Sequence, residues 1–351
     1  MSTEDALRIF LPAVITFIFG VGLTPILTYF LYRFKFWKPK AGKIALDGTA
    51  ASTFNELHKH KEVGTPRAGG IIVWVSVLAT ATLLYVLSRV SPGSYDALGF
   101  ISRNQTWVPL AALLVGSIVG LIDDFFEVRG RGGLPLRVRL LVVASVATLC
   151  AWWFFTKLEV TAISFIDPWP ILNLGILFVP FFVLVALFLY AGGVIDGIDG
   201  LGGGVFAIMF AAYGGIAFFQ NQMDLAGLCA AVTGGLLAFL WFNIPPARYY
   251  LSETGSMGLT ILLTVVAFLT DLGGEGKGLV VLPIIALPLV ATVASNILQI
   301  TWKKLFKKKL FRIAPLHHHF EAIGWPAYKV TMRYWVVGVI AATIGLGLAL
   351  L

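Results

Sequence analysis

Residues 171–190 read ILNLGILFVPFFVLVALFLY, and residues 191–204 read AGGVIDGIDGLGGG. The first stretch carries no charge and has the length that an α-helix needs to cross a bilayer, about 20 residues. The second stretch is short and rich in glycine, and it contains Asp196 and Asp199. A long apolar run followed by a polar gap recurs along the whole chain, so this alternation decides the fold.

The chain is too apolar for a soluble domain, because 58% of its 351 residues are hydrophobic and only 13% are charged. Its mean hydropathy is +0.88. We therefore predict an all-α, polytopic integral membrane protein with about ten transmembrane helices, forming one domain over residues 1–351. Three of the windows are short, so nine spans remain an alternative. The ten windows are 9–32, 69–87, 107–122, 140–156, 171–190, 201–219, 225–242, 257–270, 279–301 and 334–351.

The distribution of basic residues predicts the orientation of these helices. The odd-numbered gaps between the windows hold 21 of the 26 Lys and Arg residues, and positive charge is retained on the cytoplasmic side of a membrane. We therefore expect both termini to be extracytoplasmic. The same bias accounts for the net charge of +8 without a nucleic-acid partner, and it favours anionic lipids and substrates. The expected cytoplasmic loops cover about residues 33–68, 123–139, 191–200, 243–256 and 302–333.

The clusters of carboxylates and histidines fall in these loops, so we expect them to meet on one face. Asp123 and Asp124 lie where the third window reaches the cytosol. Two carboxylates at the C-terminal end of a helix oppose its dipole, which suggests a bound cation. Adjacent helical residues point about 100° apart, so different tasks are expected for the two. A polar helix end without a function is the alternative.

Two more loops supply carboxylates. Asp196 and Asp199 are three residues apart and share a face if the backbone is helical. Unpaired carboxylates this close to hydrocarbon tend to mark ion or substrate sites, although a glycine-rich turn with two solvated aspartates is the alternative. Glu253 follows Ser252 and precedes Thr254, and we expect one of these hydroxyls to cap the eighth helix. Glu253 then lies in the first turn of that helix, where the helix dipole favours a negative charge. The alternative is that it belongs to a functional site.

The ninth gap carries two features. Residues 302–313 place apolar side chains along one helical side and lysines elsewhere, which predicts an amphipathic helix on the membrane surface. Next come His317, His318 and His319. A zinc site is not favoured, because consecutive side chains diverge and no cysteine is nearby. We predict that these histidines bind a phosphate-rich substrate or position carboxylates.

With these motifs in hand, the chain resembles the phospho-N-acetylmuramoyl-pentapeptide transferases of the polyprenyl-phosphate hexose-1-phosphate transferase superfamily. The resemblance spans nearly the whole chain. Its most specific segment is APLHHHFE, residues 314–321, which points to this branch rather than to relatives that transfer GlcNAc phosphate. The other matching segments are Gly64-Thr65-Pro66, Asp123-Asp124, residues 196–201, Phe242-Asn243 and Thr254-Gly255-Ser256.

The chain also departs from the family pattern. Glu127 and Arg139 stand where the family usually has lysine, and Tyr190 and Gly193 stand where it usually has asparagine. Ser252-Glu253 replaces the usual Gly-Asp. Glu keeps the charge of Asp on a longer arm, whereas Arg keeps only the charge of Lys. An atypical lineage, a different nucleotide-sugar and a weakened enzyme are the alternatives that these departures leave open.

The resemblance implies a Mg²⁺-dependent reaction on the cytoplasmic face of the bacterial plasma membrane. UDP-MurNAc-pentapeptide and undecaprenyl phosphate would give lipid I and UMP, a membrane step of peptidoglycan synthesis. It also implies a homodimer in the lipid bilayer.

The resemblance further implies roles for single residues. Glu253 would bind Mg²⁺, and Asp123 would deprotonate or orient the lipid phosphate, with Asp124 positioning it. Because the second pKa of a phosphate is near 6, direct attack without a base is an alternative. Catalytic roles fall to Asp123, Asp124, Asp199 and His318, and substrate-binding roles to Lys61, Arg139, Asp196, Asn243, Tyr250, His317 and His319.

Three other functions compete with this one. A transporter would place ionisable residues near the bilayer midplane, but the interiors of the windows contain no charged residue. A sister transferase would use UDP-GlcNAc or another UDP-sugar with the same metal chemistry. A non-catalytic relative is the third alternative.

Overall fold

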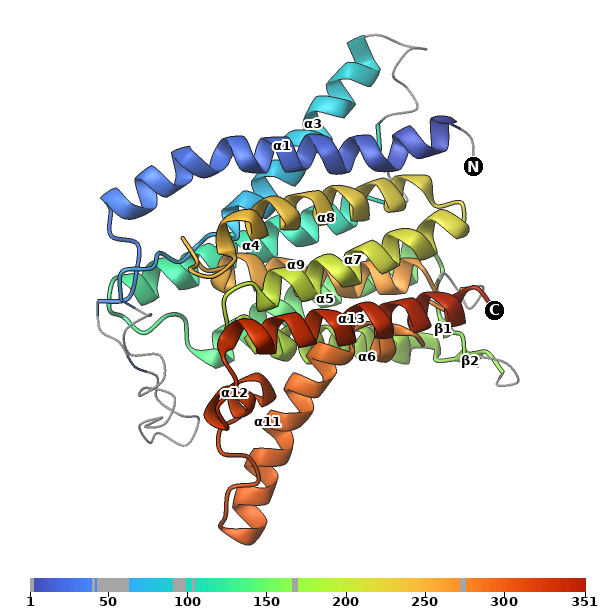
Figure 1. The fold of residues 1–351 in the computed structure, drawn as a ribbon. Helices are drawn as coiled ribbons and strands as arrows, with labels where there is room; N and C mark the ends of the chain where they lie inside the picture. Colours follow the sequence, from blue (N-terminus) through green and yellow to red (C-terminus); the bar gives the residue numbers. More distant parts are fainter. Residues whose placement is uncertain are drawn as a thin grey trace.

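The computed structural model describes residues 3–39, 42, 63–90, 99–102, 105–165, 170–271 and 276–351, and these are almost entirely helical. Figure 1 shows long helices running side by side in a bundle. The prediction of an all-α protein is confirmed, with one short antiparallel pair added, β1 (Ala162–Ile163) and β2 (Leu172–Asn173). The long helices are α1 (Thr3–Arg33), α3 (Ile71–Val90), α4 (Trp107–Val128), α5 (Leu136–Lys157), α6 (Phe178–Gly192), α7 (Leu201–Phe219), α8 (Met223–Asn243), α9 (Ser252–Leu269), α11 (Leu287–Phe306) and α13 (Ala327–Ala349).

Nine helices in the described part of the chain are long and apolar enough to cross a membrane. They correspond to nine of the ten predicted windows, so the chain is a multi-pass membrane protein by length and composition. Helix α6 is extended at its start by a 3₁₀ turn, η2 (Gly175–Leu177), and at its end by another, η3 (Gly193–Ile195).

The predicted ninth window, residues 279–301, is not one continuous helix. The short helix α10 (Leu282–Ile285) ends at Ala286, and α11 starts directly afterwards with Pro288 in its first turn. Proline lacks an N–H and clashes with the preceding turn, so it starts a helix more readily than it continues one. In Figure 1, α11 leans away from the bundle.

The expected amphipathic helix over residues 302–313 is wrong beyond Phe306. Helix α11 ends there, and Lys307 adopts a left-handed conformation with φ 56°. The chain then folds back on α11, because the side-chain oxygen of Gln299 accepts hydrogen bonds from the N–H groups of Leu310 and Phe311. Closely spaced lysines at 303–309 repel one another on a continuous helix, which favours this break. The short helix α12 (Leu316–Ala322) follows.

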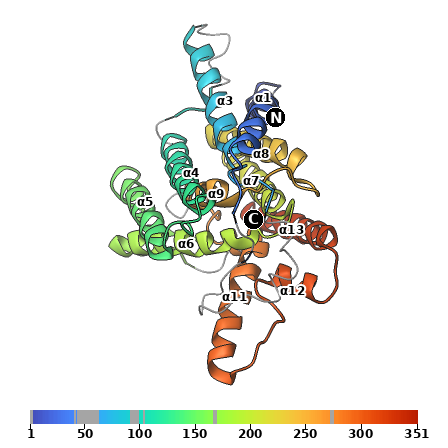
Figure 2. The same ribbon diagram turned by 90° about the vertical axis from the view of Figure 1, so that its left-hand side faces the viewer.

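Helix α9 lies at the centre of the bundle, with the other long helices around it (Figure 2). Its most apolar window is 94% buried. Helix α4 packs closely along α9 because both carry glycine at the contact. A Cβ atom on Gly116 would lie 2.8 Å from Cα of Gly258, and one on Gly120 would overlap the backbone oxygen of Glu253. This close approach brings the end of α4 against the start of α9.

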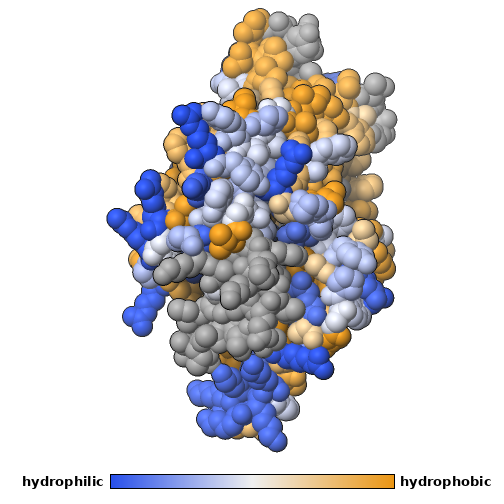
Figure 3. Space-filling view, turned by 60° about the vertical axis from the view of Figure 1, so that its left-hand side comes forward, coloured by the Kyte–Doolittle hydropathy of each residue, from blue (hydrophilic) through white to orange (hydrophobic). Residues whose placement is uncertain are grey.

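The two ends of the bundle differ in character. Both termini and the β1–β2 pair lie at one end, and α12 lies at the other (Figure 1). Figure 3 turns that second end towards the viewer and shows hydrophilic side chains gathered over it, with hydrophobic side chains at the flanks.

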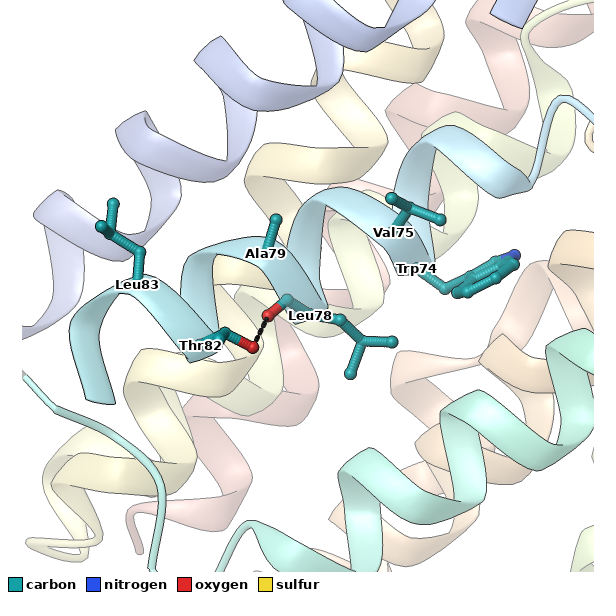
Figure 4. Close-up of a pocket in the computed structure, with 6 residues that line it drawn as sticks. All are labelled: Trp74, Val75, Leu78, Ala79, Thr82 and Leu83. Atoms are coloured by element: carbon teal, nitrogen blue, oxygen red, sulfur yellow. Dashed lines mark hydrogen bonds between the residues drawn. The ribbon is translucent and has the colours of Figure 1, made fainter. Parts of the chain in front are cut away.

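A groove on the outside of the bundle is apolar. It runs along α3 and is lined by Trp74, Val75, Leu78, Ala79, Thr82 and Leu83 (Figure 4). None of these side chains is charged, so the groove offers a mostly apolar surface.

Candidate active site

The site begins with the segment that precedes α3, which packs against the segment that leads into α9. The N–H of Tyr250 donates to the carbonyl oxygen of Pro66 at 2.9 Å, and the N–H of Gly69 donates to that of Tyr250 at 2.8 Å. A side chain on Gly70 would overlap the backbone of α9, so glycine is required there. The pairing fixes Arg67 beside the end of α4.

Asp124 lies at the centre of the site and is fully buried. Its Oδ1 accepts a hydrogen bond from Nε of Arg67 at 2.9 Å. Its Oδ2 accepts hydrogen bonds from the hydroxyls of Ser252 and Thr254, both at 2.5 Å, and from the N–H of Thr254 at 3.0 Å. A carboxylate at a helix N-terminus satisfies free N–H groups and the helix dipole. Asp124 of α4 therefore caps α9, where the sequence had suggested a cap from Ser252 or Thr254 alone.

Glu127, one turn after Asp123, forms two ion pairs. Its Oε1 lies 2.7 Å from Nζ of Lys38, and its Oε2 lies 2.8 Å from an Nη of Arg67. Burial by itself lowers the pKa of Arg67, but the carboxylates of Asp124 and Glu127 raise it above its ordinary value, so the guanidinium stays charged. Protein cations thus offset the acidic end of α4.

Asp123 has different surroundings from its neighbour. Its side chain is almost completely buried, and Oδ1 accepts a hydrogen bond from the N–H of Leu134 at 2.6 Å. Nε of Arg139 lies 3.9 Å from the same oxygen. Among the described residues, Oδ2 of Asp123 accepts no hydrogen bond, so this oxygen is free to interact with a substrate. The two adjacent aspartates thus have different contacts, and their different tasks stay a prediction.

Glu253 lies beside Asp123 on the first turn of α9. Nη1 of Arg139 lies 2.6 Å from its Oε1, and the hydroxyl of Tyr190 donates to its Oε2 at 3.2 Å. Arg139, Tyr190 and Glu253 are three of the positions at which the chain departs from the family pattern. Their contact indicates that the three departures are parts of one local rearrangement.

Ser252 adopts a backbone conformation that normally favours glycine, with φ 53°. It stands where the family pattern has glycine. Its hydroxyl reaches Asp124, its N–H donates to Oδ2 of Asp196 at 2.8 Å, and its oxygen accepts from the N–H of Ala68 at 2.9 Å. Hydrogen bonds from three segments therefore hold the serine in this conformation.

The Asp196–Asp199 turn is tied to the loop that follows α8. Asn243 is buried, and its amide accepts a hydrogen bond from the N–H of Gly200 and donates one to the carbonyl of Tyr249. Oδ2 of Asp199 accepts a hydrogen bond from the N–H of Ala247 at 3.3 Å. Within the protein, then, the side chain of Asn243 positions this turn.

The histidines lie directly against the same turn. A Cβ on Gly197 would lie 2.6 Å from Nε2 of His317 and 2.7 Å from Nε2 of His318, so only glycine allows this contact. Nδ1 of His318 lies 2.7 Å from Oε2 of Glu321, which orients the imidazole. Both rings are buried, whereas His319 is partly exposed and its Nδ1 accepts a hydrogen bond from the N–H of Arg312.

Tyr250 and Lys61 are the remaining two residues that were predicted to bind substrate. The backbone of Tyr250 joins the start of α9 to Pro66, and its ring is partly exposed. Lys61 lies outside the described residues. Carboxylates and histidines from four of the five predicted loops thus lie together, and the first loop joins them through Arg67.

The carboxylates suit a hard divalent cation, because Mg²⁺ prefers oxygen ligands. Oxygens of Asp123, Asp124 and Glu127 lie within 4.8 Å of one another. Asp124 already accepts four hydrogen bonds, so it has little capacity left for a metal. Asp123 and Glu253 keep more lone pairs available, and both face Arg139. The donor set fits a metal that also takes ligands from substrate phosphates.

Sequence reasoning did not assign Arg67, although this residue contacts both Asp124 and Glu127. The available signal was a single arginine between Pro66 and the glycines that open an apolar run. Tyr190 was noticed only as a departure from a family pattern, and nothing in its apolar surroundings predicts a contact with Glu253.

Comparison with known proteins adds to this geometry. Residues 106–271 match a family model described as glycosyl transferase family 4. A phospho-N-acetylmuramoyl-pentapeptide-transferase of Geobacillus sp. (strain WCH70) is 30% identical over 96% of both chains. A protein of that name from Anoxybacillus flavithermus is 31% identical over 95% of both. Another, from Caldanaerobacter subterraneus subsp. tengcongensis, is 33% identical over 80% of this chain and 83% of its own.

Proposed function

Because the chain belongs to the phospho-N-acetylmuramoyl-pentapeptide-transferase family, it is a membrane transferase of peptidoglycan synthesis, and we propose its substrates and mechanism. The donor is UDP-MurNAc-pentapeptide and the acceptor is undecaprenyl phosphate, and the products are lipid I and UMP. The observation that carries the proposal is the network in which Asp124 joins α4, the segment before α3 and the start of α9. With the histidines packed against the turn at Gly197, this network places carboxylates and histidines at one end of a membrane bundle, where a lipid phosphate and a soluble nucleotide can meet.

The reaction exchanges one phosphoanhydride for another. An oxygen of the lipid phosphate attacks the phosphorus that carries the sugar. A new P–O bond forms there, the bond to the bridging oxygen breaks, and UMP leaves with that oxygen. Two anionic reactants must approach, so the site has to offset charge and hold both phosphates in line.

We propose that Glu253 holds Mg²⁺, with the remaining ligands supplied by substrate phosphates. When bound, the ion neutralises charge on the phosphates. Glu127 and Asp124 are occupied by Lys38 and Arg67, so we assign them to the support of the site.

Asp123 is the proposed catalytic carboxylate. Oδ2 is the oxygen that accepts a proton from the lipid phosphate or orients it by a hydrogen bond, while the N–H of Leu134 holds Oδ1. Because the second pKa of a phosphate is near 6, most of the acceptor is already a dianion at neutral pH, and orientation is the larger part of this role.

The histidines and Arg139 are proposed to bind phosphate oxygens. His318 is preorganised by Glu321, and its Nε2 faces the turn at Gly197. Asp196 and Asp199 lie on the same turn and are assigned to the nucleoside, with Tyr250 stacking on uracil. Asn243 acts by holding the turn at Gly200.

The test is a transfer assay with purified protein, radiolabelled UDP-MurNAc-pentapeptide, undecaprenyl phosphate and Mg²⁺. We expect a lipid-linked product that is abolished by EDTA and restored by added Mg²⁺. A parallel reaction uses UDP-GlcNAc. Product from UDP-GlcNAc alone would replace the proposed donor with that of a sister transferase, and no product from either donor would contradict catalysis.

The proposal includes a cytoplasmic active site in the bacterial plasma membrane and a homodimer. The basic loops support the orientation through the retention of positive charge on the cytoplasmic side. Chemical cross-linking in native membranes, read as a band of twice the chain mass, tests the dimer.

A further inference from the structure

Both oxygens of Glu253 are held by donors from this chain. Arg139 approaches Oε1 at 2.6 Å and Tyr190 approaches Oε2 at 3.2 Å. The proposed function makes Glu253 a ligand of Mg²⁺, and the inference drawn here rests on that assignment. A guanidinium and a divalent cation compete for the same carboxylate charge, so Arg139 must affect how Glu253 binds metal.

Arg139 uses only part of its donor capacity. A guanidinium has five N–H donors, and Nη1 is the nitrogen that meets Glu253. Nε is buried and has no hydrogen-bond acceptor among the described residues. The nearest oxygen of Asp123 is 3.9 Å away, beyond hydrogen-bond distance. The side chain is still 25% exposed, so a ligand entering from the polar end can reach it.

The geometry points to Arg139 as a displaceable internal counter-ion of Glu253. Without substrate, the guanidinium neutralises the carboxylate. A phosphate group then draws the guanidinium away, because planar guanidinium binds phosphate through two parallel hydrogen bonds. The carboxylate becomes available to the divalent cation, while the hydroxyl of Tyr190 keeps it oriented through Oε2.

This arrangement couples two ligands. Divalent-cation affinity is low in the free protein and rises when a phosphate occupies Arg139, and by linkage the cation raises phosphate affinity by the same factor. A lysine at this position also has the charge, but it lacks the planar fork that can exchange a carboxylate for a phosphate.

The first test measures Mn²⁺ binding to purified protein by the electron paramagnetic resonance signal of free Mn²⁺, with no substrate present. Arg139→Gln should bind Mn²⁺ at least about tenfold more tightly than wild type, because a unit positive charge is removed next to the carboxylate. Arg139→Lys keeps the charge and should stay within about twofold. Arg137→Gln is the matched control, since Arg137 is exposed on the same helix, and it should also stay within about twofold.

Two further measurements make the result specific. In a Glu253→Gln background, Arg139→Gln should give no gain in Mn²⁺ affinity. In the wild type, saturating UMP should raise Mn²⁺ affinity, whereas uridine, which has no phosphate, should leave it unchanged. Because the phosphate of UMP is itself a Mn²⁺ ligand, displacement of the guanidinium predicts a larger gain in wild type than in Arg139→Lys, which lacks the planar fork. This comparison tests the proposal even if Arg139→Gln fails to fold, and equal gains in the two proteins would overturn it.

An Arg139→Gln protein with wild-type melting temperature and unchanged Mn²⁺ affinity would overturn the proposal, as would equal effects of UMP and uridine. The transfer assay is independent of these results. A wild type that binds Mn²⁺ as expected but makes no lipid-linked product would contradict the proposed reaction and leave the counter-ion in place.

Discussion

Two adjacent aspartates have opposite surroundings in this protein. Asp124 accepts four hydrogen bonds from Arg67, Ser252 and Thr254. Within the part of the chain that the structure describes, Asp123 accepts one from Leu134 and its Oδ2 accepts none. A charge that is fully bonded inside the protein holds the fold together, and one with a free oxygen is available for chemistry. The same residue type, at consecutive positions, therefore lies in two different hydrogen-bond environments.

Asp123→Asn should lower the rate of lipid-linked product formation at least about 100-fold, because the loss of a positioned catalytic group typically has that effect. Its melting temperature, followed by fluorescence in detergent, should stay close to wild type, since one N–H contact can be kept by the amide oxygen. A rate within a few-fold of wild type would remove Asp123 from the mechanism.

Asp124→Asn should behave differently. The amide places an NH₂ group among donors that need an acceptor, and it leaves the charge of Arg67 less compensated, so we expect a loss of about 3 kcal/mol of stability or more. The measurement is the melting temperature of the purified variant. Asp224→Asn, on α8 at the opposite end of the bundle, is the control, and its melting temperature should stay close to that of the wild type.

Ser252 provides a test of backbone strain against hydrogen bonding. Ser252→Gly removes the strain of φ 53° but also the hydroxyl, whereas Ser252→Ala removes the hydroxyl and keeps the strain. We expect a loss of about 1 kcal/mol for glycine and a larger loss for alanine. The order of melting temperatures tests this expectation, and alanine at or above glycine would contradict it.

At the scale of elements, the contact between α4 and α9 determines where the carboxylates lie. Gly120→Ala should lower both the melting temperature and the transfer rate, because a methyl group would overlap the backbone of Glu253. Gly347→Ala on α13 meets no atom within 4 Å and serves as the control. Equal behaviour of the two variants would show that α4 and α9 can separate without loss.

The end of α9 away from the site predicts a dependence of stability on pH. Burial raises the pKa of Asp271 to about 6, against hydrogen bonds from Ser164 that lower it. The folded protein therefore binds this proton more tightly than the unfolded chain. The raised pKa therefore adds to the free energy of unfolding, and this contribution is fully present below the pKa of the unfolded chain. It is lost as the pH rises towards 6, by at most about 1.4 kcal/mol per pH unit. Melting temperatures of wild type and Asp271→Asn from pH 4 to 7 test this. The wild type should fall relative to the variant, and parallel curves would contradict the expectation.

Most of the long helices were predictable from the sequence. Nine apolar windows became helices, because twenty uncharged residues bounded by polar gaps have few alternatives in a bilayer. The break at Ala286 and the fold-back after Phe306 were missed. Proline signals a helix start, but the hydrogen bonds of Gln299 to residues eleven and twelve positions later depend on tertiary structure.

The residues of the site were also largely predictable, but their contacts were not. Basic loops and family motifs pointed to the carboxylates and histidines, which do lie together. The partners of each group were not predictable, because Arg67 is 57 residues from Asp124 and Tyr190 is 63 residues from Glu253. Such pairings are determined by how the helices pack, and no local spacing encodes them.

At the scale of the whole molecule, the end that carries α12 is predicted to face the cytosol. Single cysteines placed at Lys308, after α11, and at Glu159, after α5, are exposed and lie at positions expected on opposite sides. In intact cells, a membrane-impermeant maleimide should label Glu159→Cys only, and Lys308→Cys should react after the membrane is opened. The native Cys150 and Cys229 are buried and should stay unlabelled. Labelling of both engineered positions from outside would contradict the topology.

The hydrogen bonds on Asp124 have a consequence for biogenesis. During synthesis, α3 and α4 enter the membrane well before α9, since Thr254 follows Asp124 by 130 residues. Until that late helix is inserted, the carboxylate of Asp124 has neither of its hydroxyl partners. Insertion of α9 fills the centre of the bundle and at the same time supplies these donors, so a buried carboxylate placed early in synthesis is satisfied by a helix that is placed late.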